Sequence, residues 1–413
     1  MTLTRSDGEV TPRATASGRE FIVLLTALMA MGALAIDLML PAFPDMREEF
    51  GMAADSAQVG WVITAFFLGL AVGPWLYGPI SDLIGRRTPL FIGLGVYVAG
   101  AIATILAPSF GWIVVARFVW GLGAAAPRSL SLAMVRDRYE GEAMARLMSL
   151  IMAVFLLVPI VAPGVGAGLN AIAPWRIVFV TPGVLAVGLL LWARRLPETL
   201  TPDRRRPFTW AAVGEAGRLV VTNRQTVCFM LAITCLFGVM TSFLAGSELI
   251  IEDVYGYGSW FPLFFGGVAV LLAFSSLNNA RLVGRLGLTT LVRRMSVVAA
   301  VLAAVLLVVS FTGSGRPNFW LFTLSFAPVI AMAQGLVPNC NTAAMAPLPQ
   351  VAGTASTIIA TVTTAGGALL GGLVSSAFDG TVRPFGVGIA AYAWTAAALI
   401  LIGATGRRRV NGR

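Results

Sequence analysis

Two carboxylic acids lie inside long apolar stretches of the chain, where a side chain that binds and releases protons could operate. Asp37 lies in AIDLMLPAFPDM and Glu248 lies in FLAGSELIIED. The chain has no Lys and no His, and Arg is not deprotonated in proteins, so a proton carrier must be Asp or Glu. Because apolar surroundings disfavour the charged carboxylate, we expect Asp37 to be a reversible proton site. Asp37 could instead cap a helical piece before Pro41, and Glu248 could equally face water in a loop.

Two arginines lie inside another apolar stretch, Arg117 in ARFVWGLGAAA and Arg128 in AAPRSLSL. Eleven residues make about three turns of helix, so the two side chains share a face. A charge at membrane depth costs at least about 2.5 kcal/mol, so an idle role is not expected. Arg117 could still extend to the surface. Arg128 could pair with backbone carbonyls or a polar neighbour and lock helices, or it could bind a carbonyl, nitro or anionic group of a solute, which we favour.

Other polar side chains in apolar stretches allow similar alternatives. Gln334, Asn339 and Asn341 could hydrogen-bond a solute or a neighbouring helix, and we favour the helix contact. The absence of His removes the commonest metal ligand. Cys228, Cys235 and Cys340 lie in apolar runs without metal-ligand spacing, so we expect them to pack and expect no metal site.

The elements that must hold these side chains are transmembrane helices. The chain of 413 residues is 57% hydrophobic and 12% charged, far from the composition of a soluble domain. Apolar runs of about 20 residues recur along its whole length, and such runs span a bilayer as helices. The pattern predicts twelve spans, at 21–43, 58–80, 88–107, 111–134, 146–170, 177–193, 226–248, 259–279, 290–312, 318–344, 354–378 and 385–405.

The arginines outside the spans predict the orientation. Only Arg47, Arg176, Arg316 and Arg383 fall on one side, and the others, from Arg5 to Arg413, fall on the opposite side. By the positive-inside rule the richer side is cytoplasmic, so both termini are expected in the cytoplasm of a bacterium, with the chain in its inner membrane. This distribution also accounts for the net charge of +10 without a nucleic-acid partner. The first run is too long for a cleaved signal peptide.

A polar stretch divides the twelve spans into two sets of six. We expect an N-terminal bundle at 1–193, a cytoplasmic linker at 194–225 that contains RRLPETLTPDRRRPF, and a C-terminal bundle at 226–413. Such an arrangement predicts an internal repeat. A weak one is visible, since LIGRR (83–87) follows the second span and LVGRL (282–286) follows the eighth.

The loop after the second span reads GPISDLIGRRTPL. It resembles the loop motif of the major facilitator superfamily at Gly78, Asp82, Gly85, Arg86 and Arg87, although Leu replaces the basic residue that usually follows the Asp. The resemblance implies that Asp82 packs against the start of the eleventh span, 353–356, and stabilises the outward-open state. A purely topogenic loop is the alternative.

Two further stretches resemble motifs of this family. ARFVWGLGAAA is similar to the fourth-span motif, in which an Arg is linked to proton coupling, and this implies that Arg117 is the electrostatic partner of Asp37. VPIVAPGVGAGLN is similar to the fifth-span motif of the antiporters, with Pro159 and Pro163 to soften the helix and Gly166 to allow close packing. A generic Gly/Pro-rich span is the alternative for the second stretch.

The stretch IDLMLPAFP, together with WRIVF and LPET, resembles the bicyclomycin/phenicol resistance subfamily of twelve-span drug:proton antiporters. The resemblance implies an all-α membrane protein of two pseudo-symmetric six-helix bundles that exports small amphipathic drugs. It implies a monomer that uses the proton gradient and no cofactor. Export or uptake of an endogenous metabolite is the alternative. An enzyme is not expected, because the chain has no Ser-His pair and no phosphate-binding loop.

Overall fold

The computed structural model describes residues 18–205 and 209–404. Arg5, Arg13, Arg206, the run 407–409 and Arg413, which contributed to the predicted orientation, lie outside the described residues.

The twelve predicted spans are confirmed: the described part of the chain contains twelve helical segments long and apolar enough to cross a membrane, and it contains no strand. They are built from α1 (Gly18–Asp37), α3 (Trp61–Ile84), α4 (Arg87–Ile105), α5 (Phe110–Arg138), α6 (Gly141–Ile172), α7 (Ile177–Trp192), α9 (Arg224–Leu249), α10 (Phe261–Leu286), α11 (Leu288–Ser310), α12 (Phe319–Met345), α13 (Ala352–Ser376) and α14 (Arg383–Ala404). Two shorter helices are α2 (Phe43–Glu49) and α8 (Trp210–Thr222).

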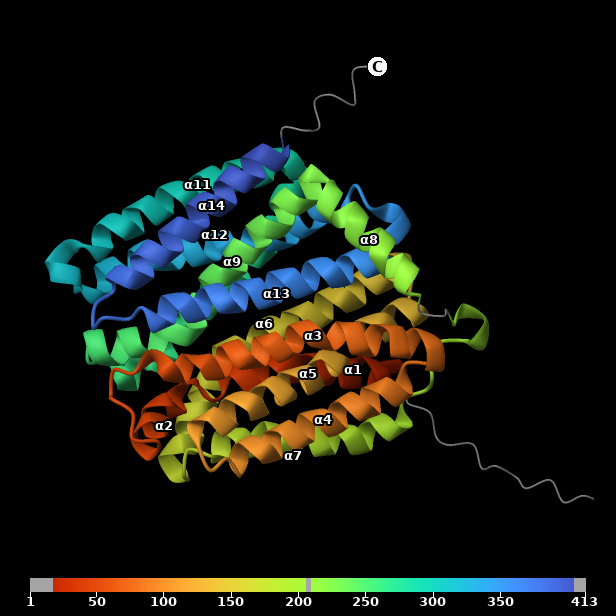
Figure 1. Ribbon diagram of the computed structural model, residues 1–413, viewed down its shortest axis with the longest axis horizontal. Coiled ribbons are helices and arrows are strands. Elements are labelled where there is room, and N and C mark those ends of the chain that lie inside the picture. Colours follow the sequence, from red (N-terminus) through yellow and green to blue (C-terminus); the bar gives the residue numbers. More distant parts are fainter. Residues whose placement is uncertain (1–17, 206–208, 405–413) are drawn as a thin grey trace, which may run out of the picture.

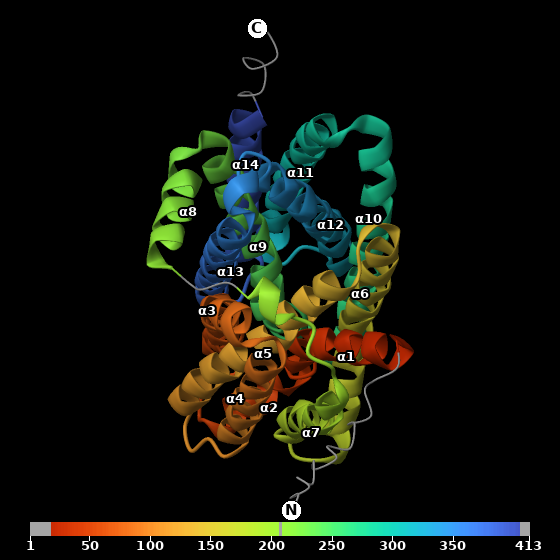
Figure 2. The same cartoon turned by 90° about the vertical axis from the view of Figure 1, so that its right-hand side faces the viewer.

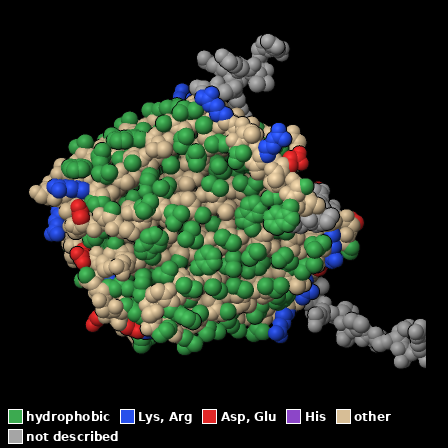
Figure 3. Space-filling model, viewed as in Figure 1, with side chains coloured by type: hydrophobic (Ala, Val, Ile, Leu, Met, Phe, Trp, Pro, Cys, Tyr) green, Lys and Arg blue, Asp and Glu red, His purple; other side chains and the backbone are tan. Residues whose placement is uncertain are grey.

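These helices form two halves, with α1–α7 in the lower part of Figure 1 and α9–α14 in the upper part. Figure 2 shows the two groups from the side, with α6 reaching α10 of the other half. Apolar side chains cover the middle of the surface, and charged side chains gather at its two margins (Figure 3). An apolar belt between charged margins is the surface that a bilayer requires.

The termini define the two ends of the molecule. Twelve crossings are an even number, so Gly18 and Ala404 lie at the same end, which we call the termini end. The far end is the opposite one and carries α2, at the left of Figure 1.

Glycines allow the helices of one half to pack at backbone distance. A Cβ added at Gly69 of α3 would lie 2.0 Å from the carbonyl oxygen of Phe118, and one added at Gly121 of α5 would lie 1.9 Å from that of Phe66. No side chain fits either position, so α3 and α5 touch through their backbones, as small residues permit in membranes.

The first span ends earlier than the sequence indicates. α1 stops at Asp37, and the chain continues through a short 3-10 turn at Leu40–Ala42 into α2. Pro41 occupies the first turn of this new piece, where its missing N–H costs nothing. Met39, and not Asp37, occupies the N-cap position, so the capping alternative for Asp37 is wrong.

The linker also differs from the expectation of a plain polar segment. It contains α8, thirteen residues long, which packs against α9 and α13. Ala216 and Val220 lie on its buried side, four residues apart, as expected for an amphipathic helix.

Candidate transport site

A buried ion pair joins the two halves at the far end. Arg47 of α2 donates through Nη1 to Glu248 Oε1 of α9 at 3.0 Å and through Nη2 to Oε2, so the pair is bidentate. The side chains are 4% and 3% exposed. Arg47 Nε also donates to the carbonyl oxygen of Ser56 at 3.0 Å. Glu248 is therefore a buried helical residue, and the alternative of a loop position facing water is wrong.

Packing between the halves continues from this ion pair along α3 and α13. Gly60 lies so close to α13 that an added Cβ would be 2.9 Å from Ser375 Oγ. Further along, Trp75 Nε1 donates to Thr361 Oγ1 at 2.7 Å, and Thr361 Oγ1 donates to the carbonyl oxygen of Ala71 at 3.0 Å. The halves are thus in contact from the far end to about the level of Trp75.

Beyond that level α3 and α13 separate around a groove of 680 Å³ at the termini end. Gly78 and Asp82 line one wall, Gly353 and Thr354 line the other, and Glu215 of α8 contributes from the linker. A Cβ added at Gly78 would meet nothing within 4 Å, so Gly78 makes no close helix contact in this arrangement. The far end is closed and the termini end is parted, which is one of the two arrangements that a rocking transporter adopts.

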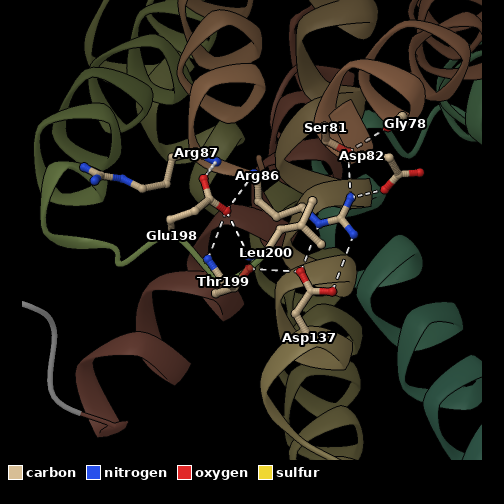
Figure 4. A network of polar contacts seen from close by, with 9 residues as sticks. All are labelled: Gly78, Ser81, Asp82, Arg86, Arg87, Asp137, Glu198, Thr199 and Leu200. Carbon is tan, nitrogen blue, oxygen red and sulfur yellow. Dashed lines mark hydrogen bonds and ion pairs between the residues drawn. The ribbon is translucent and has the colours of Figure 1, made fainter. Parts of the chain in front are cut away.

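Arg86 is the centre of a polar network beside this groove. It pairs with Asp82, donates through Nε to Asp137 Oδ2 of α5 at 2.9 Å, and donates through Nη1 to Ser81 Oγ at 2.8 Å. Figure 4 shows the guanidinium group between the two carboxylates. Asp82 is 51% exposed, so its carboxylate remains accessible from the groove.

Glu198 holds the backbone of the same loop from the end of the first half. Its carboxylate accepts hydrogen bonds from the backbone N–H groups of Arg86, Arg87, Thr199 and Leu200, at 2.8 to 3.1 Å. Burial acts to raise the pKa of the Glu198 carboxyl, but these donors outweigh it and hold that pKa below its usual value. Gly85 has φ +106°, and a Cβ there would lie 2.5 Å from Glu198 Oε2, so this turn requires glycine.

Asp37 and Arg117 lie in adjacent parts of the first half without forming an ion pair. Asp37 is 4% exposed, and its carboxylate has no hydrogen-bond partner among the residues that the structure describes. Arg117 Nη1 donates to the carbonyl oxygen of Ala35, two residues before Asp37, at 3.1 Å.

Aromatic rings hold the Arg117 guanidinium group inside the protein. The Phe66 and Trp120 ring centres lie 4.5 and 4.9 Å from its Cζ. Arg117 is fully buried, so it does not extend to the surface. The electrostatic partnership of Arg117 with Asp37 that the resemblance implies is therefore not formed in this arrangement, because Arg117 binds the backbone of α1 and not the carboxylate. Asp37 remains a buried carboxylate without a counter-charge, and such a group is able to take up a proton.

The remaining residues singled out by sequence fall into different surroundings. Pro159 and Pro163 lie within a continuous α6, and a Cβ at Gly166 would lie 2.1 Å from the carbonyl oxygen of Leu38. This contact explains why glycine is needed beside the turn after α1. Arg128 is exposed, although it lies ten residues before the end of α5.

The polar residues of α12 separate into one helix contact and two accessible side chains. Asn339 is buried, and its Nδ2 donates to Asn279 Oδ1 of α10 at 2.7 Å, which is the helix contact favoured from sequence. Gln334 is half-buried and Asn341 is exposed.

No group of three potential ligands able to hold a metal occurs in the part of the chain that the structure describes. Cys228, Cys235 and Cys340 are free, and Cys228 and Cys340 are buried.

Residues 23–372 match the family model described as Major Facilitator Superfamily. The chain belongs to the major facilitator superfamily. The superfamily fold explains the two halves, each of which supplies helices to the central interface.

Relatives among known proteins resemble this chain over most of its length. A bicyclomycin resistance protein homolog of Haemophilus influenzae is 28% identical over 88% of this chain and 91% of its own. Multidrug resistance protein D of Escherichia coli is 26% identical over 85% of this chain and 87% of its own. Both names agree with the drug:proton antiporter branch of the superfamily, which the motifs around Asp37 resemble.

A solved structure has the same fold. A D-xylose-proton symporter superposes with a TM-score of 0.74 at 15% identity, covering 92% of this chain and 97% of its own. At this identity the likeness supports the fold alone.

Proposed function

We propose that this major facilitator protein exports small amphipathic drugs across the bacterial inner membrane in exchange for protons. The relatives named for bicyclomycin resistance and multidrug resistance support the substrate class. The observation that carries proton coupling is Asp37, a buried carboxylate without a polar partner among the described side chains. The solute crosses unaltered, so the protein is a carrier and not an enzyme.

In this proposal the termini end faces the cytoplasm, since the arginines concentrate there. The structure then corresponds to a state closed to the outside and parted on the cytoplasmic side. We assign residues 1–193 and 226–413 as the two moving units and 194–225 as their linker. The carrier works as a monomer and needs only the proton gradient.

Two contacts between the halves alternate during the transport cycle: the Arg47–Glu248 pair at the far end, and a contact of Asp82 with α13 at the termini end. Opening the far end separates α2 from α9, so the Arg47–Glu248 pair must break, and Glu248 becomes a second acid able to take a proton. Closing the termini end removes the groove and brings Asp82 to the first turn of α13, whose free N–H groups favour an anion. The Arg86 network positions Asp82 for this contact.

Transport by the purified protein tests the proposal directly. The protein is reconstituted into liposomes, and uptake of chloramphenicol is followed with and without an imposed pH gradient. We expect accumulation only with the gradient, and collapse of accumulation on addition of a protonophore. Equal uptake in both conditions would exclude proton coupling, and an absence of transport of chloramphenicol, bicyclomycin and an anionic aromatic drug would exclude the drug class.

A further inference from the structure

Arg128 is exposed on a helix face that is otherwise largely buried in protein. On α5 it shares this face with Arg117, which lies about three turns away. Most of its neighbours along this face are buried, namely Gly121, Ala124, Ser131 and Val135, and Leu132 is half-buried. A lipid-facing position would expose its neighbours as well, so the accessible space beside Arg128 lies inside the protein.

The guanidinium group of Arg128 has no protein partner. No hydrogen bond, ion pair or ring contact joins it to another side chain or to the backbone within residues 18–205 and 209–404. Arg117 differs in this respect, because two carbonyl oxygens and three aromatic rings hold it in place. A role for Arg128 in locking helices would require a comparable contact.

The acidic residues within the spans do not neutralise Arg128. Glu248 is bound to Arg47 at the far end. Asp37 lies at the level of Arg117, since Arg117 reaches Ala35, and is therefore separated from Arg128 by about 16 Å along the helix axis. The interior surface near Arg128 thus carries an unpaired positive charge, which is costly at this depth without a counter-ion.

We propose that Arg128 binds an anionic group of the transported solute, so that this carrier prefers amphipathic aromatic compounds that bear a carboxylate or a sulfonate. The inference rests on the proposed export function and adds a substrate class to it. The planar guanidinium fork donates two parallel hydrogen bonds to such a group. An anion supplied by the solute compensates the charge of Arg128 while an aromatic body packs against the apolar helices.

The test compares two fluorescent probes that share an aromatic body and differ in charge. Anilinonaphthalene sulfonate is anionic, and phenylnaphthylamine is its neutral counterpart. Energy transfer from the 10 tryptophans of the purified full-length protein reports each probe only when it is near the protein. We expect Arg128→Gln to weaken sulfonate binding by about tenfold and to change binding of the neutral probe by less than about twofold.

Two variants serve as controls. Arg136→Gln removes an exposed charge from the same helix near the termini end, and binding of both probes should stay as in the wild type. Arg128→Lys keeps the charge but not the fork, so sulfonate affinity should fall between those of the wild type and Arg128→Gln. If Arg128→Gln is too unstable to purify, the Lys variant still tests the proposal through the ratio of the two affinities.

The outcomes separate the inference from the proposed function. Equal loss of both probes in Arg128→Gln, with a lower unfolding temperature, would overturn the inference in favour of a structural role. Unchanged sulfonate binding would also overturn it. Binding of the probes is measured without a pH gradient. Selective loss of sulfonate binding in Arg128→Gln would therefore uphold the anion site even if gradient-driven transport by the protein failed.

Discussion

Arg47 of α2 and Glu248 of α9 form a bidentate ion pair that is buried between the two halves of the molecule. The two residues are 201 positions apart in the sequence. Their pairing closes the far end, next to the contact of Gly60 with Ser375. Removing one partner leaves a buried charge unpaired, so a substitution at either residue should favour opening of the far end.

The first prediction concerns this ion pair. Glu248→Gln should destabilise the far-end-closed arrangement by about 3 kcal/mol or more, because Arg47 loses its counter-charge. Ser375→Cys, buried at the same interface, serves as the reporter. Its labelling by a membrane-impermeant maleimide should become several-fold faster in Glu248→Gln. The chain with its native cysteines alone provides the background.

Two variants make this test specific. The exchange Arg47→Glu with Glu248→Arg should restore slow labelling, since the pair is rebuilt in reverse. Arg176→Gln breaks the more exposed pair with Glu49, which lies at the same end but within one half, and it should change labelling little. Slow labelling in Glu248→Gln would show that the pair does not hold the far end closed.

The second prediction concerns proton coupling. Asp37→Asn should abolish efflux driven by a pH gradient and keep drug binding, because the amide cannot carry the proton. Asp37→Glu should retain partial transport. Counterflow of labelled drug without a gradient separates carrier movement from coupling. Full gradient-driven efflux in Asp37→Asn would show that Asp37 is not the proton carrier, and Glu248 would then be the candidate for that role.

The third prediction concerns Asp82. Asp82→Asn should slow transport turnover several-fold and leave drug affinity within about twofold, since Asp82 acts in the closing of the termini end and not in binding. Transport rates in liposomes and equilibrium binding of the same drug provide the comparison. Normal turnover would contradict a switching role. Glu215→Gln, on the linker side of the same groove, is the matched control.

The fourth prediction follows from the lowered pKa of Glu198. A group whose pKa is lower in the folded state stabilises the fold above its usual pKa, and this contribution is lost as the pH falls through the lowered value. Glu198→Gln should therefore lower the unfolding temperature at pH 7. The difference from the wild type should vanish once the pH is well below 4.5, the usual value. A difference that is independent of pH would assign the effect to packing.

The fifth prediction concerns orientation. Reporter fusions at Asp55 and Asp253, both at the far end, should be active outside the cytoplasm, and a fusion at Arg205 should be active inside it. Alkaline phosphatase and green fluorescent protein distinguish the two sides. The opposite pattern would reverse the direction of every step proposed above.

Features that depend on local composition could be read from the sequence. Twelve apolar runs predicted twelve spans, because hydropathy over about 20 residues is a local property that lipid enforces. The loop around Asp82 and the stretch around Asp37 indicated the superfamily, which the match over residues 23–372 confirms. The sequence did not indicate the helix α8, since its thirteen residues are too few to span a membrane and follow a segment rich in charge.

Features that depend on which distant segments meet were decided only by the tertiary structure. From sequence, Arg47 was one of four arginines on the sparse side and Glu248 an acid of uncertain surroundings. Folding joins them across 201 residues, and it brings Glu198 to the backbone of Arg86 across 112. Sequence also placed Arg117 and Arg128 on one helix face. Only the packing of the other helices buries Arg117 and leaves Arg128 accessible, because burial depends on neighbours that are far away along the chain.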